Sequence, residues 1–256
     1  MSDALIRRYR AARRDPSLAV LEGFHALKHA LRFGAEVLEA VAVDPAELER
    51  LATDLAPDLV APLSAEVTTV RDKVLAELAP QAPRTGVVAI ARRPQVDLDS
   101  VLAEQRPAPL VLLEDPRTMG NMGACVRVAA AADAGGVLTI GENDPWHPDA
   151  LRAAAGLHFA LPVAGAERVP ESDRPLVAID PGGDDLRPGD LPLRAILAFG
   201  SERYGLSADL LARADACLGI PMRAGVSSLN LATAVAAVLF SRRLIEPGAG
   251  SIRISG

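Results

Sequence analysis

Aromatic residues make up only 3% of this 256-residue sequence, and histidine occurs four times. Extended stacking of nucleic-acid bases on aromatic side chains is therefore excluded as its main mode of binding. Cys125 and Cys217 are too few and too isolated for a disulfide framework or a zinc site, and we expect two buried, inert thiols. His25 and His29 are four residues apart without an evident third ligand, so no metal site is expected.

The sequence also lacks an uncharged apolar run of the roughly 18 residues that a membrane-spanning helix needs. Arginines occupy the N-terminal segment where a secretory signal would be apolar, so we expect a cytoplasmic protein without membrane contact. Half of the residues are apolar, enough to fill the core of one large domain or two modest ones. The net charge of −6 argues against a uniformly basic surface but not against a local basic patch.

One such patch lies near the N-terminus, where Asp3 is the only acid. Its members are Arg7, Arg8, Arg10, Arg13 and Arg14. A run of this kind is typical of a solvated terminal helix, and it is equally suited to contact a phosphate backbone. Both interpretations stay open at this point.

Helices and strands alternate along the chain, which predicts an α/β protein. In residues 1–93 the patterns predict helices at 3–14, 23–34, 45–56 and 65–78 and strands at 38–44, 58–64 and 85–91. Residues 94–109 are rich in proline and charge and form a predicted linker with one short helical piece. A second domain is predicted at 110–246, followed by a loose tail at 247–256.

The strands of the second domain are predicted at 110–115, 135–141, 161–165, 175–180, 194–200 and 217–222. These strands are continuous apolar runs without alternation, which indicates a mostly parallel sheet with helices on both faces. Ligands of such sheets bind beyond the carboxyl ends of the strands, so polar residues at those positions are candidate site residues.

The first candidates are Asn121 and Arg127, in a helical segment that follows the strand at 110–115. Asn121 is predicted as the N-cap of that helix. Arg127 has no carboxylate partner on its own helix, because its neighbours three and four residues away are glycine or alanine. It either extends into water or contacts a ligand or second chain that these small residues admit, and its position favours the second interpretation.

Two later strand ends have similar features. Gly200 ends a strand before a tight loop with Glu202 and Gly205, and the strand that ends near Pro221 leads to a helix predicted to begin near Ser227 or Ser228. We expect one polar site composed of Asn121, Arg127, Glu202, Ser228 and Asn230. A dinucleotide fingerprint, a phosphate-binding P-loop and a nucleophile elbow are all absent, so dehydrogenases, nucleotide hydrolases and serine esterases are disfavoured.

These segments carry a resemblance to a known family. Asn121-x-Gly123-x-x-x-Arg127, Gly200-Ser201-Glu202-x-x-Gly205-Leu206, and Ile220-Pro221-Met222 followed by Ser228-Leu229-Asn230 resemble the three ordered motifs of the SpoU (TrmH-type) RNA ribose methyltransferases of the SPOUT class. The resemblance covers most of residues 110–245, and residues 1–93 are similar to that family's substrate-binding domain, which resembles a ribosomal protein of α/β type. It implies a deep trefoil knot and a homodimer whose active site draws on both chains.

The resemblance further implies methyl transfer from S-adenosylmethionine to a ribose 2′-hydroxyl of RNA. We expect 23S ribosomal RNA as the substrate, with a tRNA enzyme or a catalytically silent RNA-binding or ribosome-assembly factor as alternatives. Residues that match the family's cofactor-binding positions are Gly200, Ile220, Met222 and Leu229. Arg203 and Tyr204 stand where many relatives have glycine, and Arg203 is expected to contact RNA phosphate.

Arg127 and Glu202 have separate expected roles. A guanidinium has a pKa above about 12, so Arg127 is expected to grip a phosphate and stabilise the developing alkoxide instead of removing a proton. Glu202 is expected to orient Arg127 or Asn121.

Overall fold

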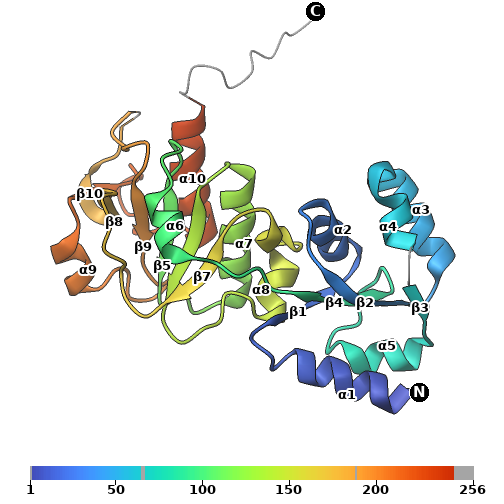
Figure 1. Cartoon of the computed structure of the whole chain (residues 1–256). Helices are drawn as coiled ribbons and strands as arrows, with labels where there is room; N and C mark the ends of the chain where they lie inside the picture. Colours follow the sequence, from blue (N-terminus) through green and yellow to red (C-terminus); the bar gives the residue numbers. More distant parts are fainter. Residues whose placement is uncertain (1, 65–66, 188, 245–256) are drawn as a thin grey trace, which may run out of the picture.

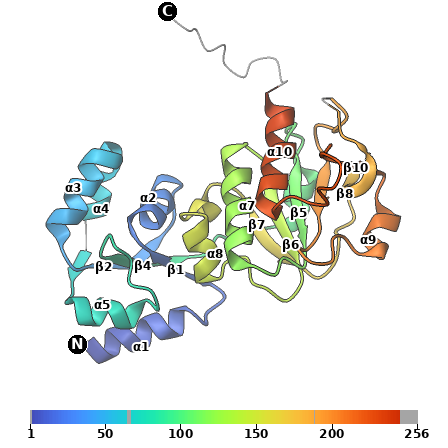
Figure 2. The same cartoon turned by 180° about the vertical axis from the view of Figure 1, so that it is seen from behind.

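The computed structural model describes residues 2–64, 67–187 and 189–244, and these residues form two sheets with helices on their faces (Figures 1 and 2). The first sheet has the strand order β1-β4-β2-β3, and the second has the order β10-β8-β9-β5-β6-β7. The two sheets lie on either side of the linker predicted at 94–109.

The first sheet consists of β1 (Leu18–Glu22), β2 (Val37–Ala42), β3 (Val67–Thr69) and β4 (Val87–Arg92). Strand β4 pairs antiparallel with both β1 and β2, whereas β3 pairs parallel to β2. One face is covered by α1 (Ser2–Ala12) and α5 (Asp72–Leu78), and the other by α2 (Phe24–Arg32), α3 (Pro45–Leu55), the short 3₁₀ helix η1 (Pro57–Leu59) and α4 (Val60–Ser64) (Figure 1). Successive strand residues therefore supply two cores, as the two-residue period of a strand requires.

The second sheet consists of β5 (Leu110–Glu114), β6 (Gly136–Ile140), β7 (Val163–Ala166), β8 (Leu176–Asp185), β9 (Ile196–Phe199) and β10 (Ala216–Gly219). All pairings described between its strands are parallel, as the apolar strand runs predicted. The helices α7 (Met119–Ala131), α8 (Pro148–Ala153) and α10 (Leu231–Arg243) share the core of one face, and α6 (Leu98–Ala103) and α9 (Ala208–Arg213) pack on the other. The 3₁₀ helix η2 (Leu157–Phe159) follows α8 and contacts α2 of the first sheet.

Three predictions for the first 93 residues are wrong. Residues 58–64, predicted as a strand, belong to η1 and α4, where Leu63 is fully buried against the helices beside it. The helix predicted at 65–78 is confined to 72–78, because the β-branched residues 67–69 pair with β2 as an edge strand. Strand β1 was not predicted, although it pairs with β4 along its whole length.

The tail predicted at 247–256 lies outside the described residues. Within the described part of the chain, no helix combines the length and apolarity that a membrane crossing requires.

Candidate functional site

The three motif segments meet at the carboxyl edge of the second sheet, because the strands that precede them are parallel neighbours. Asn121 lies in the first turn of α7, Glu202 in the loop after β9, and Asn230 directly before α10. Asn230 caps α10, since its Oδ1 accepts hydrogen bonds from the amides of Ala232 (3.0 Å) and Thr233 (3.3 Å).

A chain of hydrogen bonds connects these three side chains. Asn230 Nδ2 donates to Asn121 Oδ1 at 3.0 Å, and Asn121 Nδ2 donates to Glu202 Oε1 at 2.7 Å. The other carboxylate oxygen of Glu202 accepts from the backbone amide of Arg117 at 3.2 Å. The orientation of each amide is thereby fixed, and all three motifs are held in one network.

Glu202 is ionised at neutral pH in this network. Burial alone would raise the pKa of its carboxyl, but hydrogen bonds from Asn121, from backbone amides including that of Arg117, and from Thr118 together hold the pKa below its usual range. The network therefore presents a fixed negative charge beside the polar groups of the motifs.

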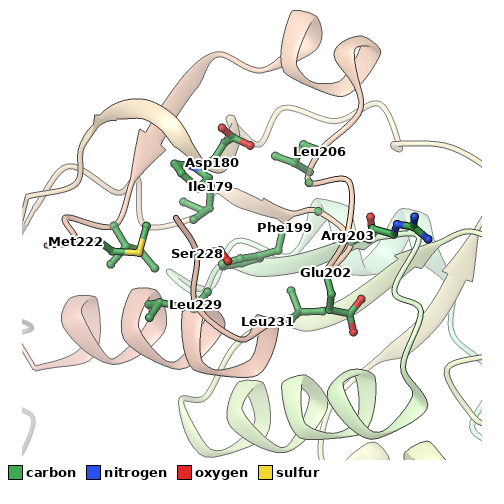
Figure 3. Close-up of a pocket in the computed structure, with 16 residues that line it drawn as sticks. Ile179, Asp180, Phe199, Glu202, Arg203, Leu206, Met222, Ser228, Leu229 and Leu231 are labelled. Atoms are coloured by element: carbon green, nitrogen blue, oxygen red, sulfur yellow. The ribbon is translucent and has the colours of Figure 1, made fainter. Parts of the chain in front are cut away.

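Beside the network lies a cavity of about 410 Å³, shown in Figure 3. Its walls come from the middle of β8, from the end of β9 and the loop after it, from the loop after β10, and from the start of α10. Seven site residues proposed from the sequence line it: Gly200, Glu202, Arg203, Ile220, Met222, Ser228 and Leu229. The cavity is therefore formed by the segments that carry the second and third motifs.

The cavity has further lining residues that the sequence patterns did not indicate. Ile179, Phe199 and Leu231 add apolar surface, and Asp180 places a half-buried carboxylate at the wall. Asp180 lies within β8 but closes the strand predicted at 175–180, and a carboxylate at the end of a predicted strand was the signal that could have identified it.

Two helix starts differ from the predictions. Helix α7 begins at Met119 with Thr118 in the cap position, so Asn121 is not its N-cap and its side chain is free to bond Glu202 and Asn230. Helix α10 begins at Leu231, so Ser228 belongs to the loop before it. A cap assignment from sequence fails here because tertiary partners satisfy the Asn121 side chain.

Arg127 lies apart from this network in a single chain. Its side chain is exposed and makes no hydrogen bond or ion pair with the described residues, so Glu202 orients Asn121 and not Arg127 here. Burial lowers the pKa of His25, and the charges of Lys28 and Arg127 lower it further. Arg127 is thus close enough to α2 to interact electrostatically with its cations.

One of the small residues near Arg127, Gly123, is required for helix packing. A Cβ at Gly123 would lie 2.1 Å from the carbonyl oxygen of Ala150, so this glycine permits close packing of α7 on α8. Gly123 therefore leaves no space there for a ligand or second chain.

The N-terminal arginines are not equivalent. Arg13 donates to Glu22 Oε1 at 2.7 Å and to the carbonyl of Leu78 at 2.6 Å, so its guanidinium already has partners within the chain. Arg8 forms an ion pair with Glu39 at 2.8 Å, and Arg10 lies 3.9 Å from Glu77. Arg7 and Arg14 are both exposed.

Of the two cysteines expected to be buried, Cys125 is buried and Cys217 is only partly buried. Cys125 and Cys217 are free, and burial raises the pKa of both thiols. The described residues contain no group of three metal-binding side chains.

The profile of the SpoU rRNA Methylase family matches residues 108–240, more than half of the chain and all of the site just described. The chain belongs to this family.

The similarity to individual relatives extends beyond the residues of the site. The chain is 32% identical over 168 residues to a 23S rRNA (uridine(2479)-2′-O)-methyltransferase of Streptomyces viridochromogenes, covering 60% of this chain and 58% of that protein. It is 28% identical to a 23S rRNA (adenosine(1067)-2′-O)-methyltransferase of Streptomyces azureus, covering 90% and 88% of the two chains. Among solved structures, the SpoU methyltransferase AviRb from S. viridochromogenes, in complex with the cofactor AdoMet, superposes with a TM-score of 0.75 at 25% identity, covering 94% of this chain and 97% of that one. An AdoMet-bound rRNA methyltransferase from Sinorhizobium meliloti superposes with a TM-score of 0.74 at 26% identity, covering 96% and 97%.

Proposed function

We propose that this protein transfers the methyl group of S-adenosylmethionine to a ribose 2′-hydroxyl of 23S ribosomal RNA. The observation that carries the proposal is the hydrogen-bonded network of Glu202, Asn121 and Asn230 at the edge of the 410 Å³ cavity. The activities named for the S. viridochromogenes and S. azureus relatives support the substrate class. A cytoplasmic location would follow from this substrate.

The cavity fits the cofactor in size and chemistry. Its volume lies within the range of roughly 300–1,000 Å³ typical of pockets for small organic ligands, and its apolar side chains suit a purine ring. Exposed backbone around Gly200, Ile220, Met222 and Leu229 supplies hydrogen-bonding groups for the adenosyl portion. The AdoMet complexes of two relatives support this assignment.

When bound, the cofactor supplies a methyl group on a sulfonium, which a ribose oxygen attacks in line as the S–C bond breaks, and the hydroxyl proton is lost to an RNA phosphate or to water. The task of the protein is to align the hydroxyl and to stabilise negative charge on its oxygen. Asn121 has an amide fixed by two partners, and Ser228 brings a hydroxyl to the cavity wall. We assign Glu202 and Asn230 as positioning residues that hold Asn121.

A second copy of the chain would complete the site. Arg127 is exposed and separate from its own chain's network, which supports a homodimer in which Arg127 of one protomer grips the substrate phosphate in the site of its partner. The proposed role is electrostatic, through a bidentate contact.

Mixed dimers test this arrangement. Arg127→Ala and Glu202→Gln chains are each expected to be nearly inactive, and their mixture should regain about a quarter of normal activity, because half of randomly paired dimers are mixed and each has one intact site. A mixture no more active than its parents would contradict a shared site.

The first sheet and its helices are proposed as the RNA-binding domain, comprising residues 1–93. Lys28 on α2 lies near Arg127 on α7, with His25 beside them, and these two cations support a path for the RNA backbone between the two sheets. The N-terminal arginines are kept as proposed contacts on the opposite face of the first sheet: Arg7, Arg8, Arg10, Arg13 and Arg14. Arg203, at the cavity wall, is a further proposed phosphate contact.

The finer features of the fold are also proposals. We infer the trefoil knot from the family resemblance, and support comes from β8 and the loops after β9 and β10, which all contribute to one cavity. The likeness of the first domain to a ribosomal protein has the same basis.

Incubation with tritiated cofactor tests the function directly. Unmodified 23S rRNA and tRNA transcripts serve as substrates, and the methylated nucleotide is located by its resistance to alkaline cleavage. Label in 23S rRNA is expected. Label only in tRNA would replace the substrate, and cofactor binding without methylation of any RNA would favour the silent assembly factor.

A further inference from the structure

The loop between β9 and α9 exposes an aromatic ring in a chain that has few. Tyr204 is 68% exposed, and the guanidinium carbon of Arg203 lies 5.2 Å from the centroid of its ring. Among the Phe, Trp and Tyr side chains of the described residues, one other is exposed. It is Phe33, which is 46% exposed and follows α2 in the first domain. Tyr204 is thus an exposed aromatic residue directly beside the proposed active site.

The loop holds Tyr204 in a defined place. The amide of Ser201 donates to the carbonyl of Gly205 at 3.1 Å, and the amide of Gly205 donates back to the carbonyl of Ser201 at 3.0 Å. The amide of Tyr204 donates to Ser201 Oγ at 3.2 Å. Gly205 has a φ of +68°, and a Cβ at Gly200 would lie 2.0 Å from the carbonyl carbon of Gly205, so this turn requires both glycines.

The position of this loop relative to the site is also fixed. Glu202, two residues before Tyr204, is bound to Asn121 of α7 and to the amide of Arg117. Two residues of chain span at most about 7 Å, so the Tyr204 backbone lies within one nucleotide's reach of the network. The arginine that stacks on Tyr204 lines the cavity itself.

We propose that Tyr204, with Arg203 stacked on it, binds the base of the nucleotide whose ribose enters the Asn121–Glu202–Asn230 network. This inference rests on the proposed function and adds a specificity-determining residue to it. Proteins that recognise single-stranded RNA stack unpaired bases on aromatic rings and on guanidinium planes, and the Arg203–Tyr204 pair offers both. The surroundings favour RNA over a protein partner, because the loops at this edge also expose Arg117 and Arg223.

Three variants separate stacking from structural effects. Tyr204→Ala removes the ring, and Tyr204→Phe keeps it. Leu193→Ala, at an exposed apolar position of the second domain outside the cavity lining, is the control. The first readout is the quenching of 2-aminopurine in a short single-stranded oligoribonucleotide, which does not require methyl transfer. The second is KM for the 23S rRNA transcript, together with the dissociation constant of S-adenosylmethionine. The third is the sedimentation coefficient.

Tyr204→Ala is expected to lose most of the quenching and to raise KM for RNA roughly tenfold, within the range measured for loss of one base–aromatic stack. Tyr204→Phe and Leu193→Ala should stay within about threefold of the wild-type KM, and cofactor binding should be unchanged in all three variants. Wild-type quenching and KM in Tyr204→Ala would overturn the inference. A changed sedimentation coefficient with normal quenching would also overturn it and would assign Tyr204 to a protein contact.

Failure of the proposed function would be recognised separately. It would appear as a wild-type protein that methylates no RNA, and in that case the quenching comparison still decides whether Tyr204 stacks on a base.

Discussion

At the residue scale, the central feature is the Glu202 carboxylate, which accepts a hydrogen bond from the Asn121 side chain. Glu202 accepts hydrogen bonds from Asn121 and from the Arg117 amide, so replacing it by glutamine sets an NH₂ group against one of these donors. Loss of one charge-assisted hydrogen bond costs about 1.5–3 kcal/mol, and we expect Glu202→Gln to lower kcat by roughly 10- to 100-fold. Single-turnover methylation measures this effect. Glu167→Gln, at an exposed position outside the cavity lining, is the control, and equal rates for the two variants would remove Glu202 from the mechanism.

His158 gives the stability of the fold a pH dependence. It is fully buried, its Nε2 donates to the carbonyl of Pro145 at 2.8 Å, and its Nδ1 has no partner among the described residues. Burial lowers its pKa to about 4 from 6.5; the Pro145 carbonyl and Asp144 oppose this shift, and Arg93 adds to it. The unfolded chain therefore binds the proton at higher pH than the folded chain, so the stability contribution is complete above pH 6.5 and is lost as the pH falls towards 4.

From these pKa values, lowering the pH from 7.5 to 5 should remove about 2 kcal/mol of unfolding free energy through His158 alone. In His158→Gln this pH-dependent loss of unfolding free energy should be absent, even if the substitution lowers the stability at both pH values. Urea unfolding of both proteins at the two pH values measures the difference. An unchanged pH slope in the variant would show that His158 is not responsible.

At the element scale, strand and helix types in the second domain followed from the sequence because its apolar runs are long and bounded by glycine and proline. The first domain was harder. Residues 58–64 are apolar and short, and only their contacts with α2 and α3 decide that they form a helix. The site shows the same division: the sequence identified the three motif segments, whereas the partners of Asn121 and the isolation of Arg127 depend on contacts between elements far apart in the chain.

Two glycines of α7 test the packing of that helix. Gly123 meets the backbone of α8, whereas a Cβ at Gly120 would have no atom within 4 Å. Gly123→Ala is expected to destabilise the protein by about 1–3 kcal/mol as α7 and α8 separate. Gly120→Ala should instead stabilise it by about 0.5–1 kcal/mol, because alanine favours a helix over glycine. Thermal unfolding of the pair measures both signs, and destabilisation of equal size in both variants would contradict the packing explanation.

At the scale of the whole molecule, a buried carboxylate joins the two sheets. Glu22 of β1 has a side chain only 1% exposed, and it pairs with Arg13, directly after α1, at 2.7 Å and with Arg152 of α8 at 2.7 Å. Beside it, His29 of α2 hydrogen-bonds the carbonyl of Ala155 at 2.7 Å. A Cβ at Gly156 would lie 2.5 Å from the carbonyl of Ala26, so the two domains touch through backbone as well as charge.

These contacts predict that the orientation of the first domain, the proposed RNA-binding domain, depends on Arg152. Arg152→Ala removes one of the two cations that compensate Glu22. Breaking a buried ion pair in this way costs about 3–5 kcal/mol of unfolding free energy. We expect a loss at the lower end of that range, because Arg152 is half-exposed and Arg13 remains paired with Glu22. The second sheet and its cavity keep their contacts, so cofactor affinity should change little while KM for RNA rises. Hydrogen exchange should increase in α2 and η2, where the domains meet. Arg50→Ala, which breaks an exposed pair with Glu47 within α3, should cost under about 1 kcal/mol and leave exchange at that interface unchanged. If Arg152→Ala weakened cofactor binding as much as RNA binding, the ion pair would be supporting the site itself and not the placement of the domain that delivers the RNA.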